Sequence, residues 1–204
     1  MATKLYLRST TTNAIGSTYQ DMVTTEGSGS INSVTNTTAS GTEIQLTATA
    51  GGSLVQWVSG RVPAGGFTLT TSSIQLRALE SDMSANCGGR ARIFKRAADG
   101  TETELGGGPF NDGAEFGTSS GNFNWTCDVT DTAFAENDRI LLKLYLTNVG
   151  TMGGGFTCTI TYESGLDTVD SYLSINENVT FKPEKQFSIP PFSRTPKFIN
   201  RRPR

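Results

Sequence analysis

Carboxylates are the side chains of this sequence best suited to acid–base chemistry, because the chain contains no histidine. A glycosidase needs two carboxyl groups about 5–9 Å apart across a cleft, and spacing along the chain predicts no such pair. We therefore interpret the acidic residues of the polar loops as turn and solubility residues: Asp112, Glu115, Asp128, Asp131, Glu136 and Asp138. The missing imidazole also excludes Ser-His-Asp and Cys-His nucleophiles and HExxH zinc sites. We therefore expect that this chain is not an enzyme.

Metal and cofactor motifs are equally sparse. The loop carboxylates do not follow the DxDxDG spacing of a calcium loop, although a calcium site at the end of a sandwich stays an alternative. We expect no cofactor and no bound metal.

The three cysteines, Cys87, Cys127 and Cys158, show no CxxC spacing. Cys127 and Cys158 fall on the apolar faces of two predicted strands and could form a disulfide if their Cα atoms lie within about 7 Å. We favour two buried, reduced thiols, because no secretion signal is evident and cytosolic proteins rarely contain disulfides. Cys87 lies in a polar, Gly-rich stretch, where we expect it to be more exposed and without an activating base.

Aromatic side chains offer a possible sugar-stacking platform, formed by Trp57, Trp125, Tyr145 and Tyr162. Trp125 keeps the phase of an apolar strand face, which predicts a core position. Tyr145 shares its strand face with Arg139 and Lys143, so it is the better candidate for contact with a glycan or a partner.

The last 23 residues form a basic, Pro-rich arm with seven basic residues and one acidic residue, a net charge of +6. Residues 1–181 carry −8, so the total of −2 hides an acidic body with a basic arm. Apolar and basic residues alternate in the arm, which favours docking on another protein over binding nucleic acid. The predicted partner-binding residues are Lys185, Phe187, Ile189, Phe192, Arg194, Lys197, Phe198, Arg201, Arg202 and Arg204.

The elements that would position these residues are strands. The chain contains 30 Thr, 19 Ser and 23 Gly, a composition typical of pleated strands and turns. Apolar and polar residues alternate repeatedly, as at Ile140, Leu142, Leu144 and Leu146, and Asp99-Gly100 predicts a hairpin.

The pattern predicts an all-β fold, an antiparallel β-sandwich of jelly-roll type. We expect at most one helical turn, at 132–137, and a last strand at 179–181. Three parts are predicted: an N-terminal strand and polar extended segment at 1–42, the sandwich body at 43–181, and the extended basic arm at 182–204. No run approaches 18 apolar residues, so we expect no membrane span.

Several strand and turn signatures between about residues 4 and 165 resemble virion structural proteins of tailed bacteriophages. They are Lys4-Leu-Tyr-Leu-Arg8, Gln56-Trp-Val-Ser-Gly60, Leu79-Glu-Ser81, the hairpin from Arg92 to Thr101, and Glu136-Asn-Asp-Arg-Ile140. The resemblance implies a β-sandwich that decorates heads or builds tails, and the C-terminal arm lies outside it.

The sequence thus predicts a non-enzymatic virion protein, a capsid decoration or cement protein whose arms bridge subunits. We expect a homo-oligomer that contacts other virion proteins, assembled in the host cytoplasm, with no role for nucleic acid or a membrane. Two alternatives stay open: a tail, baseplate or fibre component that contacts the host, and a glycan-binding module.

Overall fold

The structure of the protein is a computed structural model that describes residues 2–11, 15, 18–26, 31–37, 43–47, 54–111, 113–149, 155–162 and 170–183. Strands make up nearly all regular structure in these ranges, which confirms the predicted all-β class. They are β1 (Thr3–Thr11), β2 (Tyr19–Val23), β3 (Asn32–Thr37), β4 (Ile44–Gln45), β5 (Gln56–Ser59), β6 (Phe67–Leu69), β7 (Ser72–Glu80), β8 (Cys87–Arg96), β9 (Glu102–Glu104), β10 (Gly121–Cys127), β11 (Thr132–Phe134), β12 (Arg139–Asn148), β13 (Thr157–Tyr162) and β14 (Tyr172–Ile175). A 3-10 turn, η1, covers Met83–Ala85.

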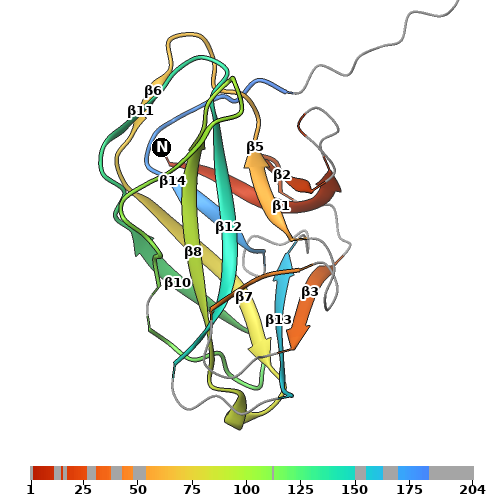
Figure 1. Ribbon diagram of the computed structural model, residues 1–204. Coiled ribbons are helices and arrows are strands. Elements are labelled where there is room, and N and C mark those ends of the chain that lie inside the picture. Colours follow the sequence, from red (N-terminus) through yellow and green to blue (C-terminus); the bar gives the residue numbers. More distant parts are fainter. Residues whose placement is uncertain are drawn as a thin grey trace, which may run out of the picture.

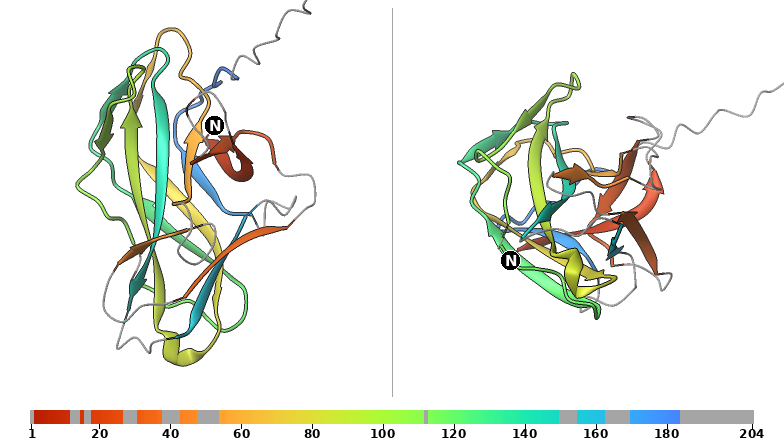
Figure 2. Two further views of the ribbon diagram at one scale, coloured as in Figure 1. Left: turned by 45° about the vertical axis from the view of Figure 1, so that its right-hand side comes forward. Right: turned by 60° about the horizontal axis from the view of Figure 1, so that its bottom comes forward.

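The strands form a sandwich in which one hydrogen-bonded path folds around the core. Its order is β3-β13-β7-β14-β1-β2-β5-β12-β8-β9, with β10 paired to β7 and β4 paired to β12. Figure 1 shows β8 and β12 in front of β7 and β10, and Figure 2 shows the same two layers from other sides. Every pairing is antiparallel except that of β2 with β5, which is parallel. The predicted sandwich is therefore present as a mixed sheet.

The longest ladder joins β8 to β12 and spans the length of the sandwich. It has ten pairs, from Arg139 opposite Arg96 at one end to Asn148 opposite Cys87 at the other. The inward residues of β12 are fully buried, as the alternation predicted: Ile140, Leu142, Leu144 and Leu146. Burial of each such side chain stabilises the fold by roughly 1.5–3 kcal/mol.

The side chains of the opposite layer pack close to Gly89 of β8. A Cβ atom at this position would lie 3.0 Å from Cζ of Phe116 and 3.4 Å from Cη2 of Trp125. A larger residue here would therefore need Phe116 to shift.

The hairpin predicted at Asp99-Gly100 is confirmed as the β8–β9 connection. Gly100 has a φ of 93°, which favours glycine, and Asp99 Oδ1 accepts a hydrogen bond from the Thr101 amide at 2.9 Å.

Local expectations were wrong at two places. Residues 132–134 form β11 rather than a helical turn, because they pair with β6 in a small second sheet. Residues 179–181 form no strand, although Val179 is buried and Lys182 bridges to Arg61. The predicted boundaries after residues 42 and 181 stay a prediction.

The cysteine interpretation was also wrong in part. Cys158 forms a disulfide with Cys87, across a Cα separation of 6.8 Å, whereas Cys127 is a free, buried thiol. Cys87 is fully buried rather than exposed, because η1 turns the chain back so that β8 begins inside the sandwich. Among the described residues, no helix is long and apolar enough to cross a membrane.

Candidate functional site

A cavity of about 420 Å³ lies at the end of the β8–β12 ladder where two arginines face each other. Among the described residues its lining contains three arginines and no acidic side chain: Ile15, Arg61, Arg96, Ala97, Ala98, Gly100, Asn137 and Arg139. Charge of one sign in a concave site attracts ligands of the opposite sign. We therefore take this arginine cavity as the candidate site.

The connections after β5, after β8 and before β12 converge to form the arginine cavity. Arg96 ends β8 and Arg139 begins β12, so the sheet register places them opposite each other. Arg61 follows β5, and its backbone exchanges two hydrogen bonds with Lys182, at 3.1 and 2.7 Å. Asn137 occupies the tight turn before β12 with a φ of 70°, and its amide donates to the Val62 carbonyl at 3.0 Å.

The three guanidinium groups differ in how they are held. Arg139 is 7% exposed and its Nη1 donates to the Ser59 carbonyl at 3.1 Å. Arg96 Nη1 donates to the Gly100 carbonyl at 2.9 Å, which fixes it against the hairpin turn. The Nε of Arg61 is buried and has no hydrogen-bond partner among the described residues, as is also true of Arg90 Nε and Trp125 Nε1.

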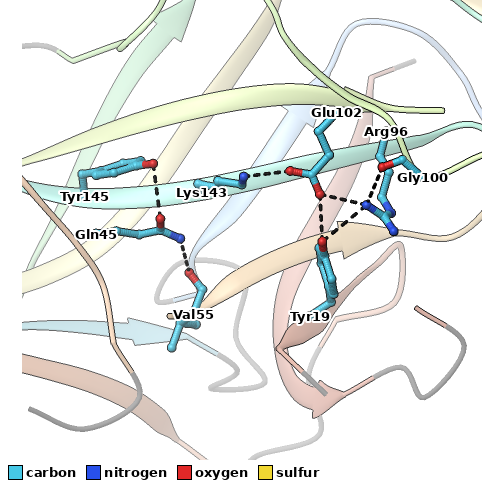
Figure 3. Close-up of polar contacts among 8 residues, drawn as sticks. All are labelled: Tyr19, Gln45, Val55, Arg96, Gly100, Glu102, Lys143 and Tyr145. Carbon is cyan, nitrogen blue, oxygen red and sulfur yellow. Dashed lines mark hydrogen bonds and ion pairs between the residues drawn. The ribbon is translucent and has the colours of Figure 1, made fainter. Parts of the chain in front are cut away.

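Glu102 of β9 bonds to Arg96 of the cavity lining and to Tyr19 and Lys143 outside it (Figure 3). Its two carboxylate oxygens accept three hydrogen bonds, from Tyr19 Oη at 2.8 Å, Arg96 Nη1 at 2.9 Å and Lys143 Nζ at 2.8 Å. Glu102 therefore offsets part of the positive charge beside the cavity.

The electrostatics of Glu102 suit a binding site better than acid–base catalysis. Burial opposes ionisation, but Lys143 and Tyr19 stabilise the charged form and hold the pKa of Glu102 below its ordinary value. Burial and the neighbouring Glu102 carboxylate raise the pKa of Tyr19. Neither group carries a proton that it could exchange near neutral pH, so the arrangement orients cations rather than moving protons.

A second ionic cluster lies farther along the same face. Glu43 accepts from Arg90 at 2.8 Å and from Arg92 at 3.0 Å, and Arg92 also pairs with Glu104 at 2.9 Å. Burial opposes ionisation of Glu43 as well, but the two arginines hold the pKa of its carboxyl below the ordinary value. These cations are each matched by a carboxylate, unlike Arg61.

Tyr145 of β12 lies opposite Arg90 of this second cluster and is half-buried. Its hydroxyl hydrogen-bonds to Gln45 at 3.3 Å (Figure 3), and the Arg92 guanidinium stands 5.3 Å from the ring centroid. Burial raises the pKa of its hydroxyl. Its contact with a glycan or partner stays a prediction.

The aromatic platform is not present. Trp57 is fully buried, and Trp125 and Tyr162 are 6% and 5% exposed. Trp57 donates from Nε1 to the Arg8 carbonyl at 3.1 Å and packs edge-on against Tyr162, which places both in the core. The core position predicted for Trp125 is confirmed.

Of the loop carboxylates, Asp138 stabilises the turn before β12. Asp138 is buried, accepts from the Ala135 amide at 2.8 Å and pairs with Lys95 at 3.1 Å. Glu136 pairs with Lys182, and Asp112 lies outside the described residues. No group of three metal-ligating side chains occurs within the described part of the chain.

The predicted partner-binding residues of the arm, from Lys185 to Arg204, all lie outside the described residues. The arginine cavity was missed from the sequence, since Arg61 is separated from Arg96 and Arg139 by 35 and 78 positions. Arg96 and Arg139 each stand at the end of a strongly alternating strand, but no local pattern indicates that β8 and β12 are neighbours.

Neither a family model nor a curated protein sequence matches this chain. Several solved structures match its fold. An aminopeptidase from a marine sediment Thaumarchaeota archaeon aligns with a TM-score of 0.55 at 9% identity, over 88% of this chain and 37% of its own. An α-amino acid ester hydrolase aligns at 0.54 with 10% identity, covering 88% and 36%. A CocE/NonD family hydrolase from Staphylococcus aureus aligns at 0.52 with 9% identity, covering 88% and 37%.

These likenesses show the fold, and this chain spans little more than a third of the length of each hydrolase. They correct the expectation of a non-enzymatic virion structural protein, because the structures that align above a TM-score of 0.5 are hydrolases. Infectious bursal disease virus structures align only at 0.30 and below, too weakly to carry an argument. The resemblance to tailed-phage proteins is therefore supported no further than the β-sandwich.

Proposed function

We propose that this chain is the β-sandwich component of a hydrolase that acts on ester or amide bonds. The supporting observation is the alignment of 88% of the chain with about a third of an aminopeptidase and of an α-amino acid ester hydrolase. At 9–10% identity the alignment shows a shared fold, and we propose the hydrolase activity in addition.

The chemistry of the chain defines which part of such an enzyme it would form. It has no histidine to activate a serine or cysteine nucleophile. The carboxylate of Glu102 is held ionised by its neighbours. We place the nucleophile and its base on a separate catalytic unit, with the sandwich packing beside it and presenting the arginine cavity.

The test is whether ester or amide hydrolase activity co-purifies with the chain. Extracts of cells that naturally produce the protein are fractionated by size, and each fraction is assayed with p-nitrophenyl acetate and an amino acid p-nitroanilide. Antibody against the chain should remove activity from the fractions that contain it, and a fluorophosphonate probe should label a serine of a co-purifying catalytic unit.

The control is a matched depletion with non-immune antibody, which should leave the activity in place. The proposal fails if the chain elutes without ester or amide hydrolase activity, or if its removal leaves that activity unchanged.

A finer proposal concerns location and partners. The resemblance of the signatures between residues 4 and 165 to tailed-phage virion proteins supports a hydrolase component carried on a virion. The basic arm would dock on other copies of the chain or on neighbouring virion proteins, as its +6 charge against the −8 of residues 1–181 favours. Mass spectrometry of gradient-purified particles should detect the chain, and its absence from them would refute this location.

A further inference from the structure

β10 is an edge strand among the described strands. Its seven residues, Gly121–Cys127, pair in unbroken register with β7, and the strand order places no other described strand beside it. Figure 1 shows β10 at the margin of the layer that it forms with β7. An edge strand presents a row of backbone donors and acceptors to which a strand of another chain can pair. β10 is therefore a candidate surface for strand addition.

The backbone of β7 alternates between its two neighbours, as in any strand inside a sheet. The Arg77 amide donates to Oγ of Ser171, just before β14, at 3.0 Å, so odd-numbered residues of β7 face β13 and β14. The Glu80 amide donates to the carbonyl of Gly117 at 3.0 Å, on the side from which the chain enters β10. Even-numbered residues of β7 therefore face β10.

The register extends this alternation into β10. Phe123 lies opposite Leu76 and Trp125 lies opposite Ile74, so the backbone of these two β10 residues faces β7. Asn124 lies between them, and its amide and carbonyl point to the other side of the strand. That side is the edge of the layer, so a partner strand would meet Asn124 at its centre.

The composition of β10 leaves this edge unprotected. Edge strands are commonly protected from other chains by charged side chains, prolines or bulges. Gly121–Cys127 contains no charged residue and no proline, and its pairing with β7 shows no break in register. The outward side chains of Asn122, Asn124 and Thr126 are exposed, and Phe123 of the inward face is only half-buried. A neutral, regular edge of this kind favours a partner strand.

A second copy of the chain fits the β10 edge in charge and in register. Residues 1–181 carry a net charge of −8, which opposes contact between two copies, but β10 offers a contact without charge. An antiparallel pair centred on Asn124 places Phe123 of each copy opposite Trp125 of the other, and Asn122 opposite Thr126. Aromatic residues then meet on the inward face, and amide and hydroxyl side chains meet on the outward face. The strand is thus complementary to itself, as a twofold interface requires.

We propose that two copies of this chain form a dimer by antiparallel pairing of their β10 strands, with a twofold axis at Asn124. Asn124 of each copy exchanges two backbone hydrogen bonds with its counterpart, because its amide and carbonyl face the same side. The layers that contain β7 and β10 then form one continuous sheet across the dimer. The proposal is independent of hydrolase activity and of the basic arm, since it concerns strands of the sandwich alone.

Sedimentation velocity of the full chain, at concentrations from about 5 to about 500 µM, tests the proposal. We expect a dimer whose fraction rises with concentration. Asn124→Pro removes an amide that faces the partner and not β7, so it should weaken dimerisation about tenfold or more. Asn124→Lys places two like charges opposite each other and tests the same contact if the proline variant does not fold.

The matched control is Ser33→Lys. Ser33 is exposed on β3, which stands at one end of the strand order, so the same charge is added to a different edge strand. This variant should dimerise within about twofold of the unmodified chain, as expected for a site outside the contact.

A second measurement locates the contact at β10. Asn124→Cys should form a covalent dimer under mild oxidation, since directly opposed Cα atoms about 5.5 Å apart can be bridged by a disulfide. Ser33→Cys should not. The proposal is overturned if the unmodified chain is a monomer over the whole concentration range or if both Asn124→Pro and Asn124→Lys dimerise as it does. It is also overturned if Asn124→Cys forms no more covalent dimer than Ser33→Cys.

Discussion

The two ends of the β8–β12 ladder differ in charge and in how they are closed. At one end, Arg96 and Arg139 border an open cavity, and at the other, Cys87 is joined to Cys158 in the core. Cys87 and Arg96 are nine positions apart in β8, a distance of about 30 Å in an extended strand. One ladder thus supports an open, cationic end suited to binding and a covalently closed end suited to stability.

The carboxylates nearest the two ends show the same contrast. Glu102 accepts from two cations and a tyrosine, which hold its pKa below the ordinary value of 4.5 despite burial. Glu80 is 2% exposed and accepts from the Cys87 amide at 3.0 Å. Burial, opposed by that amide and reinforced by Glu115, raises the pKa of Glu80. The local partner therefore decides whether a buried carboxyl stays charged.

The largest effect should come from removing the Cys87–Cys158 disulfide at the closed end of the ladder. Replacing both Cys87 and Cys158 with alanine should lower the free energy of unfolding by about 2–4 kcal/mol, since the bond closes a long loop. Urea unfolding measures this loss, and Cys127→Ala is the control that leaves the disulfide intact.

Thiol counting checks the premise directly. The denatured, unreduced chain should show one reactive thiol, from Cys127, and three after reduction. Three reactive thiols before reduction would show that Cys87 and Cys158 are not bonded. The two ends of the ladder would then not differ in covalent closure.

A smaller effect should follow from breaking the charge balance at the cationic end. Glu102→Gln leaves Arg96 and Lys143 without their carboxylate and should cost about 1–2 kcal/mol of stability. Glu104→Gln is the control on the same strand, because Glu104 pairs with Arg92 at a more exposed position and should cost less than about 0.5 kcal/mol. Equal losses from the two variants would show that the Glu102 network has no special role.

The features that could be predicted from the sequence are those encoded locally. The alternation of β12 indicated which leucines are buried, and Asp99-Gly100 indicated the hairpin, because strand faces and primed turns depend on neighbouring residues. The all-β class followed from the same signals.

The features that could not be predicted depend on which strands meet across the sandwich. Cys87 was expected to be exposed because its neighbours are polar and glycine-rich, yet it is fully buried and bonded to Cys158 of β13. Arg61 enters the cavity through the path of the chain after β5, which no local pattern indicates. The arm cannot be compared, because it lies outside the described residues.

The smallest and most diagnostic prediction concerns pH. Glu102 has a lowered pKa in the folded chain, so its stabilisation is present above about pH 4.5 and is lost as the pH falls through the folded pKa. Glu80 has a raised pKa, so its contribution is complete below about pH 4.5 and is lost as the pH rises through the folded pKa.

Glu80→Gln should therefore remove a decline of stability above pH 4.5. At pH 4 it should change stability by less than about 1 kcal/mol, because the amide oxygen can still accept from the Cys87 amide. Glu102→Gln should instead remove a loss of stability on the acid side. Urea unfolding of both variants between pH 3 and 8 separates the two, and slopes of the same sign would mean that the ends do not differ in the way their carboxyls are held.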